Sequence, residues 1–302
     1  MQHSLTDHSV EAAWFGEEDP EAAREKAAGS EAAMRALTAG VRAPSAVVQK
    51  VLRICTDPSS SMGELRSAIE VDGALSAQLV RVANSAAFAT LSPARSLDDA
   101  VLRLGVRRVR GIVTGLAALG VFQRETSYAA QIRAHSARVA GLVETLGREW
   151  RRRSAADLFL CGLVHDIGKL VLIEQGALDY PEGELGADHA HLLEREQLGF
   201  DHAALGRVLM EAWAFPADLV EVVDLHHDVA RAYEVGGEVG ASVALLRLAD
   251  HIDDALEDGD PERWSTLARS GECSYLQISV DVFEASRPRL DEVRRDAASV
   301  LG

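Results

Sequence analysis

The sequence predicts an all-α protein, a helical bundle with an N-terminal helical subdomain, and three observations support this prediction. Ala, Leu, Val, Arg and Glu dominate the 302 residues, whereas aromatic residues make up only 5%. Apolar residues recur at helical spacing, and the period-two alternation of a half-buried strand is hard to find. Since 47% of the residues are apolar, the chain can bury a sizeable core.

The helical pattern divides the chain into four parts. These are an N-terminal extension (1–42), an N-terminal helical subdomain (43–125), a larger subdomain that carries the candidate metal site (126–257) and a C-terminal extension (258–302). In the first part we expect short or frayed helices, broken at Gly16, Pro20 and Gly29.

Apolar spacing and breaks define the individual helices. Ser45 can cap a helix whose apolar stripe runs from Val47 to Cys55. The remaining helices are expected over residues 62–71, 75–83, 97–104, 106–122, 128–150, 155–174, 189–198, 201–213, 217–227, 239–257 and 280–300. Gly105 is predicted to be a hinge, and Pro288 to interrupt the last helix.

Charge, cysteine content and hydropathy exclude several classes of protein. The net charge of −16 repels a polyanion, so nucleic-acid binding is disfavoured. Cys55, Cys161 and Cys273 are odd in number and widely spaced, which fits a reducing compartment and no disulfide framework. The N-terminus lacks the pattern of a secretory signal, and no apolar run reaches the length of a membrane span. We therefore predict a cytoplasmic protein without a membrane partner.

The most informative motif is Leu-Val-His-Asp-Ile-Gly-Lys at residues 163–169, where His165 and Asp166 stand side by side on an otherwise apolar predicted helix. Polar side chains in such a place need a partner. Imidazole and carboxylate suit divalent Fe, Mn or Zn. Other predicted helices offer further ligands, which with this pair make a candidate set for one or two ions: His135, His202, His226, His227 and Asp250.

Each candidate also has a structural interpretation. His165 and Asp166 can form a buried hydrogen-bonded pair without a metal. His202 and the histidine doublet can cap helix ends or face solvent. Lys169 can contact a phosphate or simply neutralise the neighbouring carboxylates. We interpret the remaining histidines of this half as surface or capping residues: His189, His191 and His251.

The order His135, then His165-Asp166, then Asp250 resembles the HD phosphohydrolase superfamily, and the extra histidines resemble its dinuclear members. The flanking sequence is similar to the HDOD branch, which is related to the HD-GYP proteins. The similar segments are residues 71–76, 79–85, 96–97, 100–105, 199–206, 213–216 and 226–227. This resemblance covers about residues 43–255 and implies an HD-domain-like helical bundle with a regulatory role.

Two departures bear on activity. Gly73 stands where the family usually has proline after aspartate. Gln131 stands where HD-GYP cyclic-dinucleotide phosphodiesterases carry a metal-binding glutamate, and no Gly-Tyr-Pro loop follows His226-His227. An amide is a weaker ligand than a carboxylate for such ions, so hydrolysis of cyclic di-GMP is disfavoured.

Two hypotheses remain, and we favour the first. In the first, the chain is a bacterial signal-transduction module that acts through protein partners and uses its site for structure or for sensing a small phosphorylated ligand. In the second, it is a metal-dependent phosphohydrolase or phosphodiesterase with Asp166 and Lys169 as catalytic residues. The absence of a recognisable substrate-binding motif beside the site, together with the resemblance of the upstream segments to the regulatory branch, favours the first.

Overall fold

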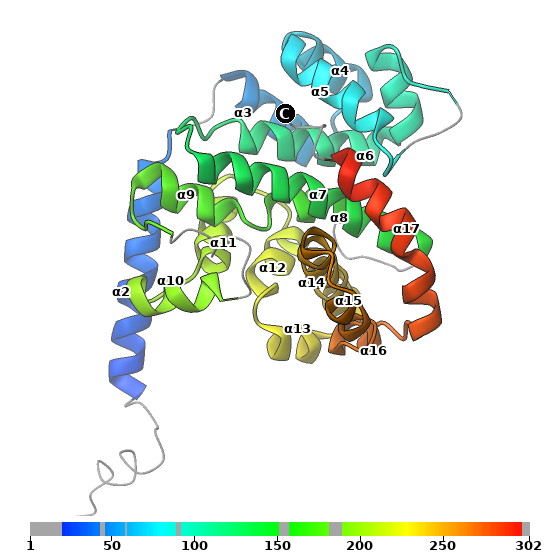
Figure 1. Ribbon diagram of the computed structural model, residues 1–302. Helices are drawn as coiled ribbons and strands as arrows, with labels where there is room; N and C mark the ends of the chain where they lie inside the picture. The colour runs from blue at the N-terminus through cyan, green and yellow to red at the C-terminus, as the bar shows by residue number, and fades with distance from the viewer. Residues whose placement is uncertain are drawn as a thin grey trace, which may run out of the picture.

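The structure is a computed structural model that describes residues 20–42, 46–57, 59–88, 92–150, 157–180 and 189–297. All regular secondary structure in these ranges is helical, which confirms the predicted all-α class (Figure 1). The helices are α2 (Pro20–Gly40), α3 (Ala46–Thr56), α4 (Met62–Glu70), α5 (Gly73–Asn84), α6 (Leu97–Leu119), α7 (Ser127–Glu149), α8 (Leu158–Val164), α9 (Ile167–Gln175), α10 (Ala190–Leu198), α11 (His202–Ala212), α12 (Ala217–Leu225), α13 (Val229–Val235), α14 (Gly237–Asp258), α15 (Pro261–Leu267), α16 (Gly271–Tyr275) and α17 (Val280–Ala297). None of these helices has the length and apolar character needed to cross a bilayer.

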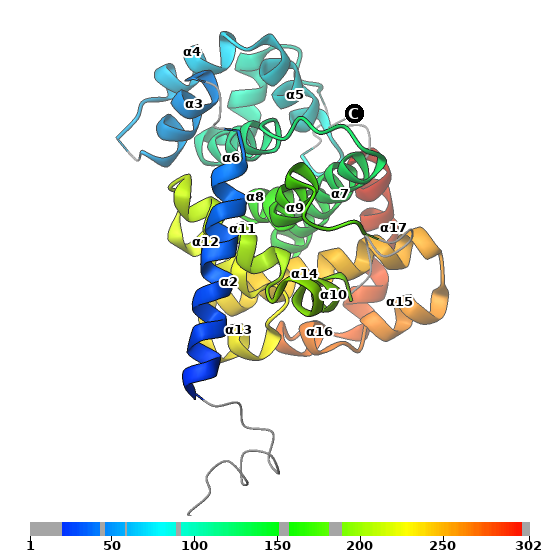
Figure 2. The same ribbon diagram turned by 90° about the vertical axis from the view of Figure 1, so that its left-hand side faces the viewer.

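The helices form a small N-terminal layer that packs on a larger bundle. Figures 1 and 2 show α3, α4 and α5 gathered at one end of the molecule, where α3 and α5 pack against α6. At the centre of the bundle, α7 packs against α8, α14 and α17, and α9 packs against α11. Helix α2 runs along the side of the bundle and contacts α9 and α11 (Figure 2).

Local sequence signals explain where several helices begin. Ser61 and Glu64 form a reciprocal capping box at the start of α4, and Ser96 with Asp99 does the same for α6. Gly105 has φ of 76°, a left-handed conformation that glycine tolerates best, and it bends α6 at the predicted hinge.

Two predicted breaks are wrong. Helix α2 continues through Gly29, because an exposed glycine inside a helix costs only about 1 kcal/mol relative to alanine and the helix gains packing from Met34. Helix α17 likewise continues through Pro288, with buried residues on both sides of it. The candidate cap Ser45 and the predicted break at Gly16 lie outside the described residues.

The C-terminal helix α17 ties two distant parts of the molecule together. Near its end, Asp296 accepts a hydrogen bond from the backbone N–H of Ala86, which follows α5 in the N-terminal layer (2.6 Å). On the other side, Arg294 Nε donates to Asp253 Oδ1 of α14 at 2.7 Å. The helix therefore contacts both the N-terminal layer and the bundle.

Two glycines allow unusually close helix packing around the motif at residues 163–169. A Cβ atom added to Gly162 on α8 would lie 2.4 Å from Ala140 Cα of α7. A Cβ atom added to Gly168 on α9 would lie 2.0 Å from the carbonyl oxygen of His202 on α11. Backbone atoms cannot yield as a flexible side chain can, so both positions require glycine.

We expect Gly162→Ala to destabilise the metal-free protein by about 1–3 kcal/mol, because the methyl group would push α8 away from α7. Urea unfolding followed by circular dichroism measures the change. Gly29→Ala is the matched control: its site is open, and alanine should stabilise α2 by up to about 1 kcal/mol. Equal effects at the two positions would contradict the packing argument.

Candidate metal centre

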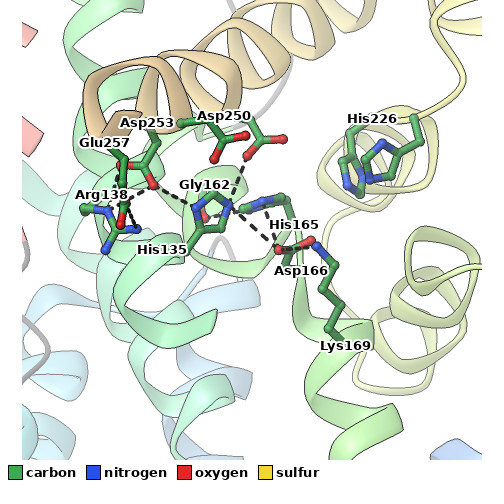
Figure 3. A network of polar contacts seen from close by, with 12 residues as sticks. His135, Arg138, Gly162, His165, Asp166, Lys169, His226, Asp250, Asp253 and Glu257 are labelled. Atoms are coloured by element: carbon green, nitrogen blue, oxygen red, sulfur yellow. Dashed lines mark hydrogen bonds and ion pairs between the residues drawn. The ribbon is translucent and has the colours of Figure 1, made fainter. Parts of the chain in front are cut away.

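The site is built around an interruption of a helix that the sequence analysis did not predict. The helix expected over residues 155–174 is two helices, because α8 ends at Val164 and α9 begins at Ile167. His165 and Asp166 occupy the turn between them, and Asp166 has the bridge-region angles φ −96° and ψ 13°. Both side chains are buried in this turn and lie beside His135 of α7 (Figure 3).

The first group of possible ligands is His135, His165 and Asp166, each with one donor atom within 4.8 Å of the others. His135 Nε2 lies 3.9 Å from Asp166 Oδ2, and His165 Nε2 lies 3.5 Å from the same oxygen. Asp250 of α14 joins this group, since its Oδ1 is 3.0 Å from His135 Nε2. Two imidazoles and two carboxylates, from α7, the turn between α8 and α9, and α14, thus lie close together.

The second group is His202, His226 and His227, whose donor atoms satisfy the same distance limit. His202 is the first residue of α11, and the doublet lies in the turn after α12. His202 Nε2 is 3.0 Å from His227 Nε2 and 3.3 Å from His226 Nε2. It is also 3.1 Å from Asp166 Oδ1, so Asp166 presents one oxygen to each group.

Hydrogen bonds fix how most of these imidazoles are oriented. The contacts of their Nδ1 atoms are His135 to Asp253 Oδ2 (2.9 Å), His165 to the Gly162 carbonyl (3.0 Å), His202 to Glu194 Oε2 (2.6 Å) and His226 to the Val223 carbonyl (2.6 Å). Because each of these partners only accepts, each Nδ1 must carry a proton and donate. In the neutral ring the Nε2 lone pair then faces the centre, as a metal ligand requires.

The donor set fits divalent metal ions. Asp166 Oδ1 is buried and accepts no hydrogen bond of acceptable geometry from the described residues. The Nε2 atom of His202 lies 3.0–3.3 Å from the Nε2 atoms of His226 and His227. Two lone pairs repel each other at this distance unless a proton or a cation lies between them. Nitrogen with carboxylate oxygen suits Zn, Fe or Mn.

The charges of the metal-free centre are balanced by protons. Burial alone would lower the pKa of His135, but hydrogen bonds to Asp250 and Asp253 outweigh it and raise the pKa to about 10. Burial likewise opposes protonation of His202, yet the Glu194 carboxylate raises its pKa to about 9. His226 is the opposite case, because burial and the nearby charge of His202 lower its pKa to about 3.

Lys169 is the second predicted catalytic residue, and it is buried against Asp166. Its Nζ donates to Asp166 Oδ2 at 2.9 Å, one helical turn along α9 (Figure 3). Burial would raise the pKa of the Asp166 carboxyl group, but the charges of His165 and Lys169 hold it well below its usual value. The ammonium group thus neutralises this carboxylate, which agrees with the structural interpretation of Lys169 given above.

The candidate ligands differ in their exposure to solvent. The side chains of Asp250 and His135 are 22% and 12% exposed, and His227 is also partly exposed. His165, Asp166 and His202 are almost completely buried. Each group thus has at least one member that solvent reaches.

All seven residues predicted as ligands lie in or against these two groups, and their role as ligands stays a prediction. The sequence analysis missed the carboxylates behind two of the histidines. Asp253 lies three residues after Asp250 on α14, and Glu194 lies four residues after buried Ala190 on α10. His191, interpreted as a surface or capping residue, instead stacks on His227 with ring centroids 4.2 Å apart.

Comparison with known proteins identifies one family. The HDOD domain family matches residues 42–229. A curated protein of Treponema pallidum, described as uncharacterized, is 25% identical over 270 residues, which cover 85% of this chain and 48% of that protein. The chain thus spans about half the length of this relative.

Solved structures share the fold. A candidate phosphohydrolase from Shewanella amazonensis has a TM-score of 0.71 at 23% identity, covering 90% of this chain and 98% of that one. An HDOD domain protein of unknown function from Geobacter sulfurreducens has a TM-score of 0.66 at 18% identity, covering 89% and 97%. These identities support the HD-domain-like helical fold alone. The family match spans well over half of the 302 residues, and the chain therefore belongs to the HDOD family.

Proposed function

We propose that this chain is a signal-transduction module that holds two divalent metal ions at a centre bridged by Asp166 and acts through protein partners. The observation that carries this proposal is the origin of the ligands. They come from α7, the α8–α9 turn, α11, the turn after α12 and α14, and they meet at one largely buried point. Occupancy of such a point stabilises one arrangement of these helices over others.

The residues divide naturally between two positions. His135, His165, Asp166 and Asp250 would hold one ion. Asp166, through its other oxygen, would hold the second together with His202, His226 and His227. Bound cations would supply the positive charge that protons on His135 and His202 supply in the metal-free chain.

A second candidate is a metal-dependent phosphohydrolase. It is supported by the full ligand set and by the ammonium group of Lys169 beside Asp166. The Shewanella structure, described as a candidate phosphohydrolase, is consistent with it. A bound ion would lower the pKa of a coordinated water, which is the chemistry this candidate needs. The near-complete burial of His165, Asp166 and His202 favours the signalling role, because a phosphodiester must reach the ions to react.

We expect protein purified without chelator to contain about two equivalents of Fe, Mn or Zn, and chelation to lower the melting temperature by roughly 5–10 °C. Elemental analysis and differential scanning fluorimetry measure these two quantities. His165→Ala should remove about one of the two equivalents and reduce the response to chelator, because the second position keeps its ligands, whereas the exposed His189→Ala should behave like the parent. Less than a tenth of an equivalent of any transition metal, with a melting temperature unchanged in His165→Ala, would refute the metal centre.

Metal binding should release about two protons at pH 7.5, because His135 and His202 have pKa values of about 10 and 9 and must become neutral to bind. The sign follows directly: these imidazoles hold protons below their raised pKa values, so metal affinity should increase as the pH rises toward 9. Titration calorimetry in two buffers of different ionisation enthalpy counts the protons. Identical enthalpies in both buffers would contradict this coupling.

For the signalling role, we expect no hydrolysis of bis-p-nitrophenyl phosphate above the blank of Mn²⁺ alone. The loaded protein and Asp166→Ala should give the same background rate, measured as released nitrophenolate. Turnover by the parent that Asp166→Ala abolishes would instead establish the phosphohydrolase candidate. The pair of proteins is needed because free Mn²⁺ promotes some hydrolysis by itself.

A further inference from the structure

Glu194 is a fully buried carboxylate on a helix that is otherwise mostly exposed, and it touches a candidate ligand rather than the centre itself. Its exposed fraction is 0%. Glu194 Oε2 accepts hydrogen bonds from both the backbone N–H and the Nδ1–H of His202, each at 2.6 Å. Glu194 Oε1 accepts a third from the hydroxyl group of Tyr180, also at 2.6 Å. Both oxygens are therefore occupied.

The charge of Glu194 has one direct counterpart. Among the described residues its only ion-pair partner is His202, since no arginine or lysine lies within ion-pair distance of it. Leaving a carboxylate in the interior costs several kcal/mol unless a nearby positive charge offsets it. Lys169 adds a longer-range attraction, but the direct offset among the described residues comes through the imidazole of His202, from a proton or from a cation bound at Nε2.

Asp253 provides the comparison, because it stands behind His135 as Glu194 stands behind His202. Its Oδ2 accepts from His135 Nδ1 at 2.9 Å, but Arg138 and Arg294 each donate to its Oδ1 at 2.7 Å (Figure 3 shows Arg138). Two guanidinium groups thus share the charge of Asp253, whereas none shares that of Glu194. Glu194 accordingly depends on the imidazole of His202 for its direct compensation, whereas Asp253 does not depend on His135 alone.

We infer that Glu194, held in place by Tyr180, is a positioning residue that fixes the tautomer and ring orientation of His202 and thereby sets the affinity of the second metal position. The inference rests on the proposed two-metal centre. It goes beyond that proposal because it makes the two positions unequal and assigns the inequality to a residue that binds no metal. Carboxylates behind ligand histidines typically change metal affinity by about 10–100-fold.

Titration with Co²⁺, followed by its visible absorption, tests this inference, because bands arising from nitrogen coordination report each position as it fills. Glu194→Gln keeps the size of the side chain and removes its charge; with its amide oxygen toward His202 it still accepts both bonds from that residue, and its NH2 group replaces the oxygen that accepts from Tyr180. We expect it to weaken the second position by about 10–100-fold and to leave the first within about twofold. Glu196→Gln, an exposed substitution of the same type on α10, is the matched control and should change neither.

Two further measurements separate positioning from stability. Nitrogen-15 spectra of the metal-free imidazoles should show the Nδ1–H signal of His202 shifted in Glu194→Gln, while the signals of His165 stay unchanged. If Glu194→Gln does not fold, Tyr180→Phe serves instead: it removes only the hydroxyl group and should weaken the second position by several-fold.

The outcomes distinguish this inference from the function on which it rests. If the parent protein binds fewer than two Co²⁺ ions, the two-metal centre itself fails. If the parent binds two and Glu194→Gln, or Tyr180→Phe in its place, binds both as tightly as the parent, the role of Glu194 is wrong. Equal weakening of both positions would also overturn it, because it would show a general structural effect.

Discussion

The structure depends on compensating one carboxylate that has been removed from water. Asp166 is buried in contact with residues of α7, α9 and α11, and such burial costs several kcal/mol unless positive charge surrounds the group. Lys169 compensates one oxygen directly, and two sets of imidazoles face the carboxylate from opposite sides. The surrounding polar groups are arranged around this requirement: His135 and His202 each have a further carboxylate behind them, and His165 and His226 have backbone carbonyls.

This requirement also explains features of the backbone. A continuous helix through His165 and Asp166 would separate their side chains by about 100° around its axis. The break between α8 and α9 removes that constraint and lets both side chains face the same centre. Gly162 and Gly168 then bring the two short helices against α7 and α11, so that His135 and His202 reach the carboxylate from either side.

The sequence was enough to predict the helical class, the hinge at Gly105, the family and the residues that would meet at the site. It could not predict the break at His165 and Asp166, because the apolar pattern runs through this turn without glycine or proline at the break. It placed Glu194 on a helix but gave it no role, since a lone glutamate on a polar helix is normally solvated. Gly29 and Pro288 were over-interpreted for a related reason: local propensity is a weak prior that tertiary packing can override.

The limits of the family match have a consequence for the two halves of the centre. Residues 42–229 contain every histidine of both groups and Asp166, but they end before α14 and α17. A fragment cut at those limits would retain the three imidazoles and the bridging oxygen of one half, although it would lose Arg247 of α14, which donates to the His226 carbonyl. The other half would lose Asp250 and also Asp253, which contacts Nδ1 of His135. It would also lose α17, which links Asp253 to the N-terminal layer. The His135 half of the centre is therefore complete only when the C-terminal segment is present. The same segment connects this half to helices at the far end of the molecule.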